Sequence, residues 1–112
     1  MTVTEVVDKF NDAWNAHDLE AALALCTDDV VFDSTDPAPD GVRHEGKEAV
    51  RAAWAPVFAT AGARFTGEES FVAGDRLVQR WRFDWDGGHI RGVDIIRVRD
   101  GLISEKLAYV KG

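Results

Sequence analysis

The chain has 112 residues, of which 46% are hydrophobic, and this combination predicts one globular domain over residues 1–112 rather than a disordered tail. Its 13 basic and 20 acidic residues give a formal net charge of −7. Such a surface repels phosphate backbones, so we expect no nucleic-acid partner. No apolar run approaches the roughly 18 residues of a membrane-spanning helix, so we expect no membrane partner. The N-terminus does not read as a signal peptide, and the lone Cys26 fits a cytoplasmic location.

Three helices are predicted in the first half of the chain. Thr2 and Glu5 form a capping box that begins the first helix, and apolar residues follow at helical spacing. Asp18 is a favourable N-cap for a second, shorter helix. Lys47 opens a third helix, which we expect to kink or end at Pro56 because proline lacks the backbone N–H donor.

Strands dominate the rest of the chain. A short strand over Val30–Ser34 precedes Thr35–Gly46, a stretch rich in proline, glycine and acidic residues that predicts a long loop, often a lid or binding loop. Four further strands, the first with a bulge at Gly67, are expected over Ala63–Val72, Arg76–Trp85, His89–Arg99 and Leu102–Val110. Helices followed by an antiparallel meander predict an α+β domain whose helices pack on the aromatic face of a curved sheet.

Asp94 is the leading candidate for chemistry. It alternates with Gly92, Ile96 and Val98, which share its side of the predicted strand, and that side is apolar. A carboxylate there costs free energy unless it is paired, hydrogen-bonded or protonated. Two interpretations stay open: a structural acid that accepts hydrogen bonds from backbone or tryptophan N–H groups, or an acid or base in a pocket.

Aromatic side chains gather on the inner side of the predicted sheet. Trp81, Phe83 and Trp85 share one strand face, which favours a pocket for a flat apolar molecule, although a packed core uses the same residue types. The residues that we assign to ligand binding are Phe10, Trp14, Phe32, Ser34, Trp54, Phe58, Gln79, Trp81, Phe83 and Ile96.

Few polar residues are placed to act with Asp94. His44, in the long loop, is a candidate second acid or base at the pocket mouth. Lys106, on the last strand, either pairs with Asp94, meets a ligand or extends its ammonium group to water. Ser34 and Gln79 are the other candidates. No histidine or cysteine cluster has metal-ligand spacing and no phosphate-binding loop is present, so we expect no metal and no cofactor.

Three segments carry a family resemblance: FNDAWNAHDLEAALALCTDDVVFDS, HEGKEAVRAAW and RGVDIIRVRDGLISE. They resemble the SnoaL-like branch of the nuclear transport factor 2-like superfamily, which includes ketosteroid isomerases, polyketide cyclases, limonene epoxide hydrolase, dehydratases and non-catalytic binding domains. The resemblance implies a cone of the cystatin-like type, in which a curved sheet wraps helices around an apolar pocket. It also implies a homodimer through the outer face of the sheet. It does not fix the reaction, because this fold hosts many chemistries.

Functional residues of the family carry over one position at a time. In ketosteroid isomerase, a tyrosine of the first helix and an acid of a late strand donate hydrogen bonds to the enolate oxygen, and an aspartate after the first strand moves the proton. The late-strand acid falls on Asp94, which in SnoaL-like cyclases is the position of the general base. The tyrosine falls on Phe10 and the proton-moving aspartate on Ser34. The resemblance therefore favours the cyclase-like pattern over the steroid isomerase pattern.

Together these features predict an enzyme that does acid/base chemistry without a cofactor on a small apolar ring-containing molecule. The reaction is an isomerisation, a cyclisation, a dehydration or a hydrolysis, with Asp94, His44 and Lys106 as the catalytic candidates. The alternative is a non-catalytic module for small-ligand binding or dimerisation. A second polar group beside Asp94 in an open pocket favours the enzyme, and its absence favours the module.

Overall fold

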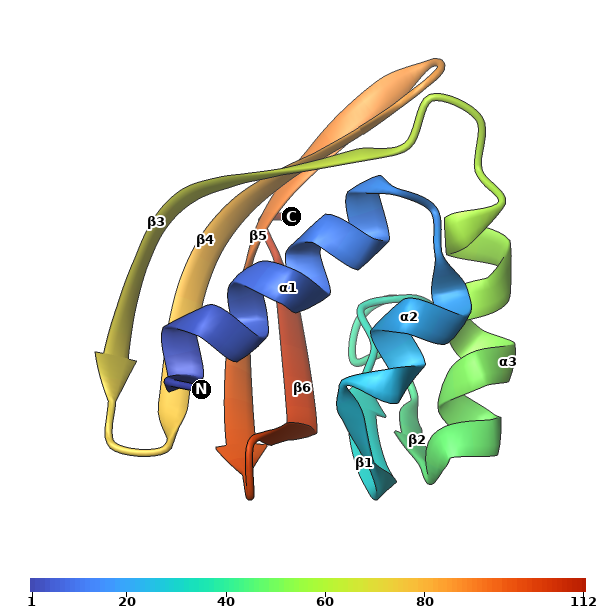
Figure 1. The fold of residues 1–112 in the computed structure, drawn as a ribbon. Coiled ribbons are helices and arrows are strands. Elements are labelled where there is room, and N and C mark those ends of the chain that lie inside the picture. Colours follow the sequence, from blue (N-terminus) through green and yellow to red (C-terminus); the bar gives the residue numbers. More distant parts are fainter.

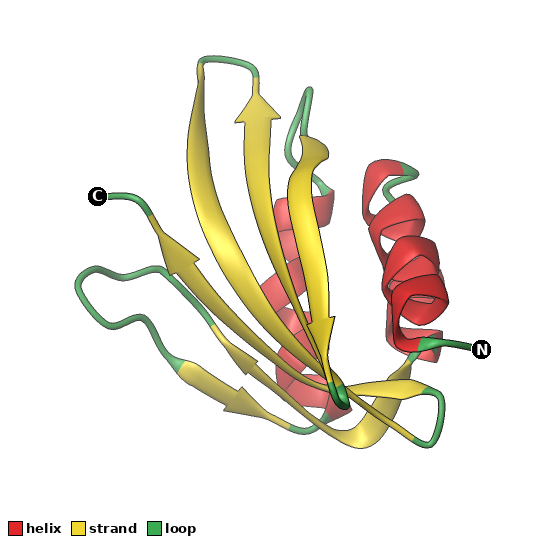
Figure 2. Ribbon diagram, turned by 90° about the vertical axis from the view of Figure 1, so that its left-hand side faces the viewer, coloured by secondary structure: helices red, strands yellow, loops and turns green.

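Three helices cover one face of a single curved sheet in the computed structural model, which describes all 112 residues (Figure 1). The helices are α1 (Val3–Asn15), α2 (Leu19–Ala24) and α3 (Lys47–Phe58). The strands are β1 (Cys26–Asp33), β2 (Arg43–Glu45), β3 (Arg64–Ala73), β4 (Arg76–Trp85), β5 (Gly88–Arg99) and β6 (Leu102–Val110). They lie in the order β2-β1-β6-β5-β4-β3, and Figure 2 shows the sheet bending around the helices. The expected α+β cone is confirmed.

Side-chain caps begin the first two helices as expected. Thr2 Oγ1 accepts a hydrogen bond from the Glu5 N–H, and Glu5 Oε1 accepts one from the Thr2 N–H, each at 3.1 Å. Asp18 Oδ1 accepts from the Ala21 N–H at 3.0 Å. The third helix continues through Pro56 and ends two residues later, at Phe58.

The sheet differs from the sequence-based expectation on the N-terminal side. β1 begins at Cys26 rather than at Val30, because Cys26 pairs with Ile103 of β6 in the parallel part of the sheet. Residues Arg43–Glu45, expected to be loop, form β2, which pairs antiparallel with β1. Both pairings join segments whose local sequence does not mark them as strands. The predicted bulge is present, since the β3–β4 register shifts just after Gly67.

The core and the pocket occupy opposite ends of the inner face. Near the β5–β6 turn, Leu77, Ile96 and Ile103 are at most 2% exposed and belong to one hydrophobic cluster with residues of α1 and α3. Towards the β4–β5 turn the sheet diverges from the helices (Figure 1). Asp94 lies two residues before Ile96 on the same face of β5, so it stands at the boundary between the two regions.

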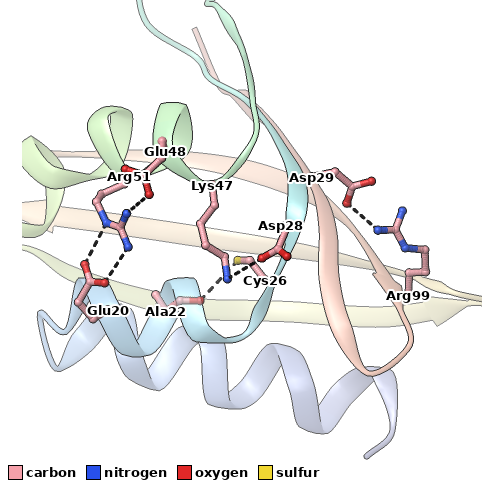
Figure 3. Close-up of polar contacts among 9 residues, drawn as sticks. All are labelled: Glu20, Ala22, Cys26, Asp28, Asp29, Lys47, Glu48, Arg51 and Arg99. Atoms are coloured by element: carbon pink, nitrogen blue, oxygen red, sulfur yellow. Dashed lines mark hydrogen bonds and ion pairs between the residues drawn. The ribbon is translucent and has the colours of Figure 1, made fainter.

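Ion pairs on the surface join α2, α3, β1 and β5 (Figure 3). Arg51 donates to Glu20 from Nε at 3.1 Å and from Nη2 at 2.8 Å, and it also binds Glu48. Arg99 Nη2 donates to Asp29 Oδ1 at 2.6 Å. These donors lower the pKa of Glu20 and of Asp29. Exposed pairs of this kind add little to the stability of a fold. The pairs of Arg51 therefore serve mainly to orient α2 relative to α3.

Candidate functional site

A pocket of about 180 Å³ opens between the second half of α1 and the part of β4 and β5 that lies toward the turn between them. Nine of its 13 lining residues are hydrophobic. The lining residues that the sequence had suggested are Phe10, Trp14, Phe32, Trp81, Phe83, Asp94 and Lys106. A small apolar cavity with a few polar groups is the usual form of a small-molecule site.

The alternation of β4 and a glycine of β5 build the sheet side of the pocket. Trp81 and Phe83 point to the same face because they are two residues apart. Gly92 is the partner of Trp81 across the β4–β5 pair. A Cβ atom at Gly92 would lie 2.6 Å from Trp81 Cζ2 and 2.3 Å from the Tyr109 carbonyl oxygen. The absence of a side chain at Gly92 therefore lets the Trp81 indole lie across β5.

Asp94 is 0% exposed and belongs to a chain of hydrogen bonds that starts on α1. Asn11 Nδ2 donates to Gln79 Oε1 at 2.9 Å, and Gln79 Nε2 donates to Asp94 Oδ2 at 3.1 Å. The second carboxylate oxygen, Asp94 Oδ1, is buried without a hydrogen-bond partner. The chain fixes the orientation of the carboxylate while leaving one of its oxygens free to accept a proton or a hydrogen bond.

Lys106 brings a positive charge to the same place. Its Nζ lies 3.7 Å from Asp94 Oδ2, and this is the only ion pair of either residue. Nζ also lies 4.6 Å from the centroid of the Trp14 ring, 5.1 Å from that of Phe32 and 5.9 Å from that of Trp54. Aromatic faces attract a cation at these distances. The lysine is thus held by one carboxylate and three aromatic rings, and only 9% of it is exposed.

Unpaired indole N–H groups surround the pocket. The Nε1 atoms of Trp14, Trp54 and Trp81 are buried and have no hydrogen-bond partner, and Trp14 and Trp81 line the cavity. Most buried donors in folded proteins are paired, so three unpaired donors beside one pocket call for an explanation. A bound ligand with hydrogen-bond acceptors would explain these unpaired donors. Because the three Nε1 atoms are buried, the indole rings must shift before the ligand can bond to them.

Three apolar residues assigned to ligand binding lie outside the pocket wall. Trp54 and Ile96 are both 0% exposed and belong to the core, as does Phe58. Trp54 packs edge-on against Phe10 and Phe32, with ring centroids 5.4 Å and 5.6 Å away. It therefore supports the wall from behind. The aromatic pattern alone does not distinguish a residue of the wall from one in the layer beneath it.

Three polar residues assigned to the site are also off the wall. Ser34 Oγ donates to the Val42 carbonyl and accepts from the Val42 N–H, so it closes the loop between β1 and β2. His44 lies in β2 and stacks on Phe32, with centroids 5.8 Å apart, instead of reaching the pocket mouth. Gln79 lies behind Asp94 and orients its carboxylate. Of the polar candidates, only Lys106 joins Asp94 at the pocket.

Sequence reasoning missed several lining residues, namely Asn11, Thr35, Val57, Phe65, Ile90 and Ala108. Two of them follow from strand register, since Phe65 and Ile90 are the partners of Phe83 on either side of β4. Asn11 carried no local signal, because it becomes important only through its contact with Gln79 on a distant strand.

The cone with an apolar pocket at one end places this chain among the NTF2-like proteins, which share its architecture. The model of the SnoaL-like domain matches residues 7–106, and the chain therefore belongs to the SnoaL-like family. No match was found among functionally curated proteins. The chain has no helix of the length and apolarity that crossing a membrane requires.

Solved structures resemble the chain over nearly its whole length. An NTF2-like protein of unknown function from Mesorhizobium loti is 44% identical, with a TM-score of 0.87, covering 98% of this chain and 91% of that one. A Mycobacterium tuberculosis protein in complex with estradiol-17beta-hemisuccinate is 32% identical, with a TM-score of 0.81, covering 96% and 92%. A computationally designed 17-OHP binder is 30% identical, with a TM-score of 0.83, covering 97% and 90%.

Proposed function

We propose that the chain binds a small, flat, oxygenated ring compound in the aromatic pocket and that Asp94 and Lys106 move a proton to or from it. The main support for this proposal is a buried ion pair at the wall of an apolar cavity, in which Lys106 Nζ lies 3.7 Å from Asp94 Oδ2. Burying two charges is costly, and apolar residues of similar size serve a fold as well or better. A pair that the fold does not need is better explained by chemistry on a bound molecule.

The composition of the pocket supports the ligand class. Aromatic rings from α1 and β4 form opposite walls that suit a planar apolar molecule. The Lys106 ammonium offers a hydrogen-bond donor to carbonyl or hydroxyl oxygens, and the buried N–H groups of Trp14 and Trp81 add donors once their rings shift toward the ligand. The estradiol derivative held by the Mycobacterium tuberculosis relative is also a ring compound with oxygen substituents, which agrees with this assignment.

The two charged groups have complementary roles in the proposed chemistry. The Asp94 carboxylate accepts a proton from a carbon next to a carbonyl group, and the Lys106 ammonium donates a hydrogen bond to the oxygen where negative charge then gathers. Return of the proton to a second position completes an isomerisation, while attack by the enolate carbon completes a cyclisation. Gln79 and Asn11 keep the carboxylate oriented throughout.

A screen of aromatic, steroid and terpenoid compounds tests the proposal. We expect compounds that fill the pocket to change tryptophan emission, because Trp14 and Trp81 lie in its wall. Phe83→Trp, which fills the cavity from β4, is a matched variant that should weaken binding without removing a polar group. If no compound from a broad set changes the emission of the wild-type chain, the pocket does not bind such ligands and the proposal fails.

A non-catalytic binding module is the second candidate. It is favoured by the complete burial of Asp94, because neighbouring side chains must shift before a ligand reaches the carboxylate oxygens. In that case Asp94 holds Lys106 in place, and Lys106 alone contacts the ligand. Binding without any turnover or proton exchange of the ligand is the result that favours this candidate over the enzyme.

We also propose a homodimer through the outer face of the sheet. One apolar row crosses four strands there, because Phe71, Val78, Ile95 and Leu107 are successive partners across β3, β4, β5 and β6. Phe71 is 57% exposed, as is Tyr109 on the same face. A contiguous apolar row bordered by arginines and acids fits an interface, with an apolar centre and a polar rim.

A further inference from the structure

Lys106 is the one lysine of the chain whose amine lies in the pocket. Lys9 and Lys111 are exposed and Lys47 is partly exposed on α3, whereas Lys106 is buried among the lining residues. Its Nζ is 3.7 Å from Asp94 Oδ2, which is an ion-pair distance but too long for a hydrogen bond. A primary amine that is enclosed by aromatic rings and not tied down by a hydrogen bond is placed to act as a nucleophile.

We propose that Lys106 captures the carbonyl group of an aldehyde or ketone ligand as a covalent iminium ion. This inference rests on the proposed function, because it names the chemical class of the molecule that the same pocket binds. It also gives the lysine a role that simple charge compensation of Asp94 does not require.

The step balances with the groups present. Asp94 accepts one proton from the Lys106 ammonium, and the nitrogen lone pair attacks the carbonyl carbon as the C=O π electrons move to oxygen. The oxygen takes the proton back from Asp94, and a second proton then passes from nitrogen to oxygen. The C–O bond breaks, water leaves, and the nitrogen lone pair forms the C=N bond. Lysine ammonium plus carbonyl compound thus become iminium plus water, with the charge conserved.

The surroundings of Lys106 stabilise both the free ammonium and the iminium product. The iminium carries its positive charge where the ammonium carried it, so Asp94 and the rings of Trp14 and Phe32 stabilise the product as they stabilise the free lysine. Trp14 and Trp81 line the cavity that the carbonyl oxygen enters, and their unpaired N–H groups are buried behind its surface. The apolar walls exclude bulk water, which otherwise hydrolyses an iminium.

Reductive trapping of the full chain tests the inference. The probe is 2-naphthaldehyde with sodium cyanoborohydride, and peptide mapping by mass spectrometry locates the attached group. We expect Lys106 to be labelled at least about tenfold faster than Lys9, Lys47 or Lys111. Asp94→Asn should slow the labelling of Lys106 by a similar factor, because it removes the proton acceptor. Equal labelling of all four lysines would overturn the inference, and this comparison within the wild-type chain needs no variant to fold.

Two controls separate this inference from the proposed function. Calorimetry with 2-naphthalenemethanol, which has the same ring and no carbonyl, reports the pocket alone. Binding of the alcohol without selective labelling of Lys106 overturns the iminium and keeps the proposed function, whereas absence of binding and labelling contradicts both. Lys106→Arg, which keeps the cation, should abolish the fast labelling, and Lys111→Arg should leave it unchanged. Fast labelling that persists in Lys106→Arg would contradict the assignment.

Discussion

Lys106 Nζ lies 3.7 Å from Asp94 Oδ2, at the boundary between the core and an aromatic pocket. The two residues are diagonal neighbours, since Asp94 is the partner of Ala108 and Ile96 is the partner of Lys106 across β5 and β6. Neither charge has another ion-pair partner. The two charges therefore depend on each other. Removing one of them leaves the other buried without a counter-charge, which destabilises the fold.

A double-mutant cycle on this pair should be strongly non-additive. Lys106→Met leaves a buried carboxylate without its counter-charge and is expected to lower the free energy of unfolding by about 3–5 kcal/mol. Asp94→Leu should destabilise comparably, whereas the double variant should be close to the wild type, because both charges and their desolvation are then removed. Urea denaturation of the four proteins gives the coupling energy. Additive losses would show that the two charges do not depend on one another.

A methyl group at position 92 should disturb the pocket. Gly92→Ala places a Cβ 2.6 Å from Trp81 Cζ2 and 2.3 Å from the Tyr109 carbonyl, so the indole and the strand must both shift. We expect a loss of about 1–3 kcal/mol in stability together with a change in near-ultraviolet circular dichroism. Gly67→Ala is the matched control in β3, on the other side of β4, since a Cβ there meets nothing within 4 Å. Equal effects of both substitutions would mean that the close approach of Trp81 is unimportant.

The single cysteine should be inert in the folded chain. Burial raises the pKa of the Cys26 thiol to about 12, while an unfolded cysteine titrates near about 8.5. Folding thus disfavours the thiolate, so this group contributes a stability that is present below the unfolded pKa and is lost as pH rises above it. We expect a thiol reagent in mildly alkaline buffer to react with Cys26 only as fast as the chain unfolds. Rapid reaction in native buffer, at a rate that denaturant does not increase, would show that the thiol is accessible.

The outer face of the sheet should control assembly. If the apolar row forms the dimer interface, Ile95→Glu places a charge within the row, between Val78 and Leu107, and is expected to shift sedimentation from dimer to monomer at micromolar concentration. Ile90→Glu, on the inner face beside Phe83, is the control that should leave the oligomeric state unchanged. A wild-type chain that sediments as a monomer at this concentration would remove the dimer proposal.

Local sequence signals predicted the elements whose stability is local. The capping box at Thr2 and the N-cap at Asp18 were both confirmed, as were the full bounds of the strand Arg76–Trp85. The bulge after Gly67 was also visible, because glycine in a strand interior marks such irregularities. In each case the residues that decide the structure lie within a few positions of one another.

Long-range pairing set the limit of prediction. The strand at Arg43–Glu45 exists because β1 lies beside it, and the loop-like composition of that region concealed it. The parallel register of β1 and β6 places Phe32 opposite Lys106, and this register brings the ring to the ammonium. The alternation of β5 predicted a buried Asp94, but the sequence left open whether Lys106 would meet it or extend to water. Such contacts depend on how distant segments dock, which no local pattern encodes.

The most direct test of the account is the turnover of a bound ligand by the Asp94→Ala variant. The chain has Phe10 and Ser34 where a steroid isomerase has its tyrosine and its proton-moving aspartate, so we expect flat hydrophobic ligands to bind but steroid enones not to isomerise at an enzyme-like rate. For a ligand that is turned over, Asp94→Ala should lower kcat by at least about 100-fold and change the Kd of an uncharged ligand much less, because a proton acceptor acts mainly in the transition state. A variant that keeps the full rate would show that Asp94 is structural and would contradict the central assignment.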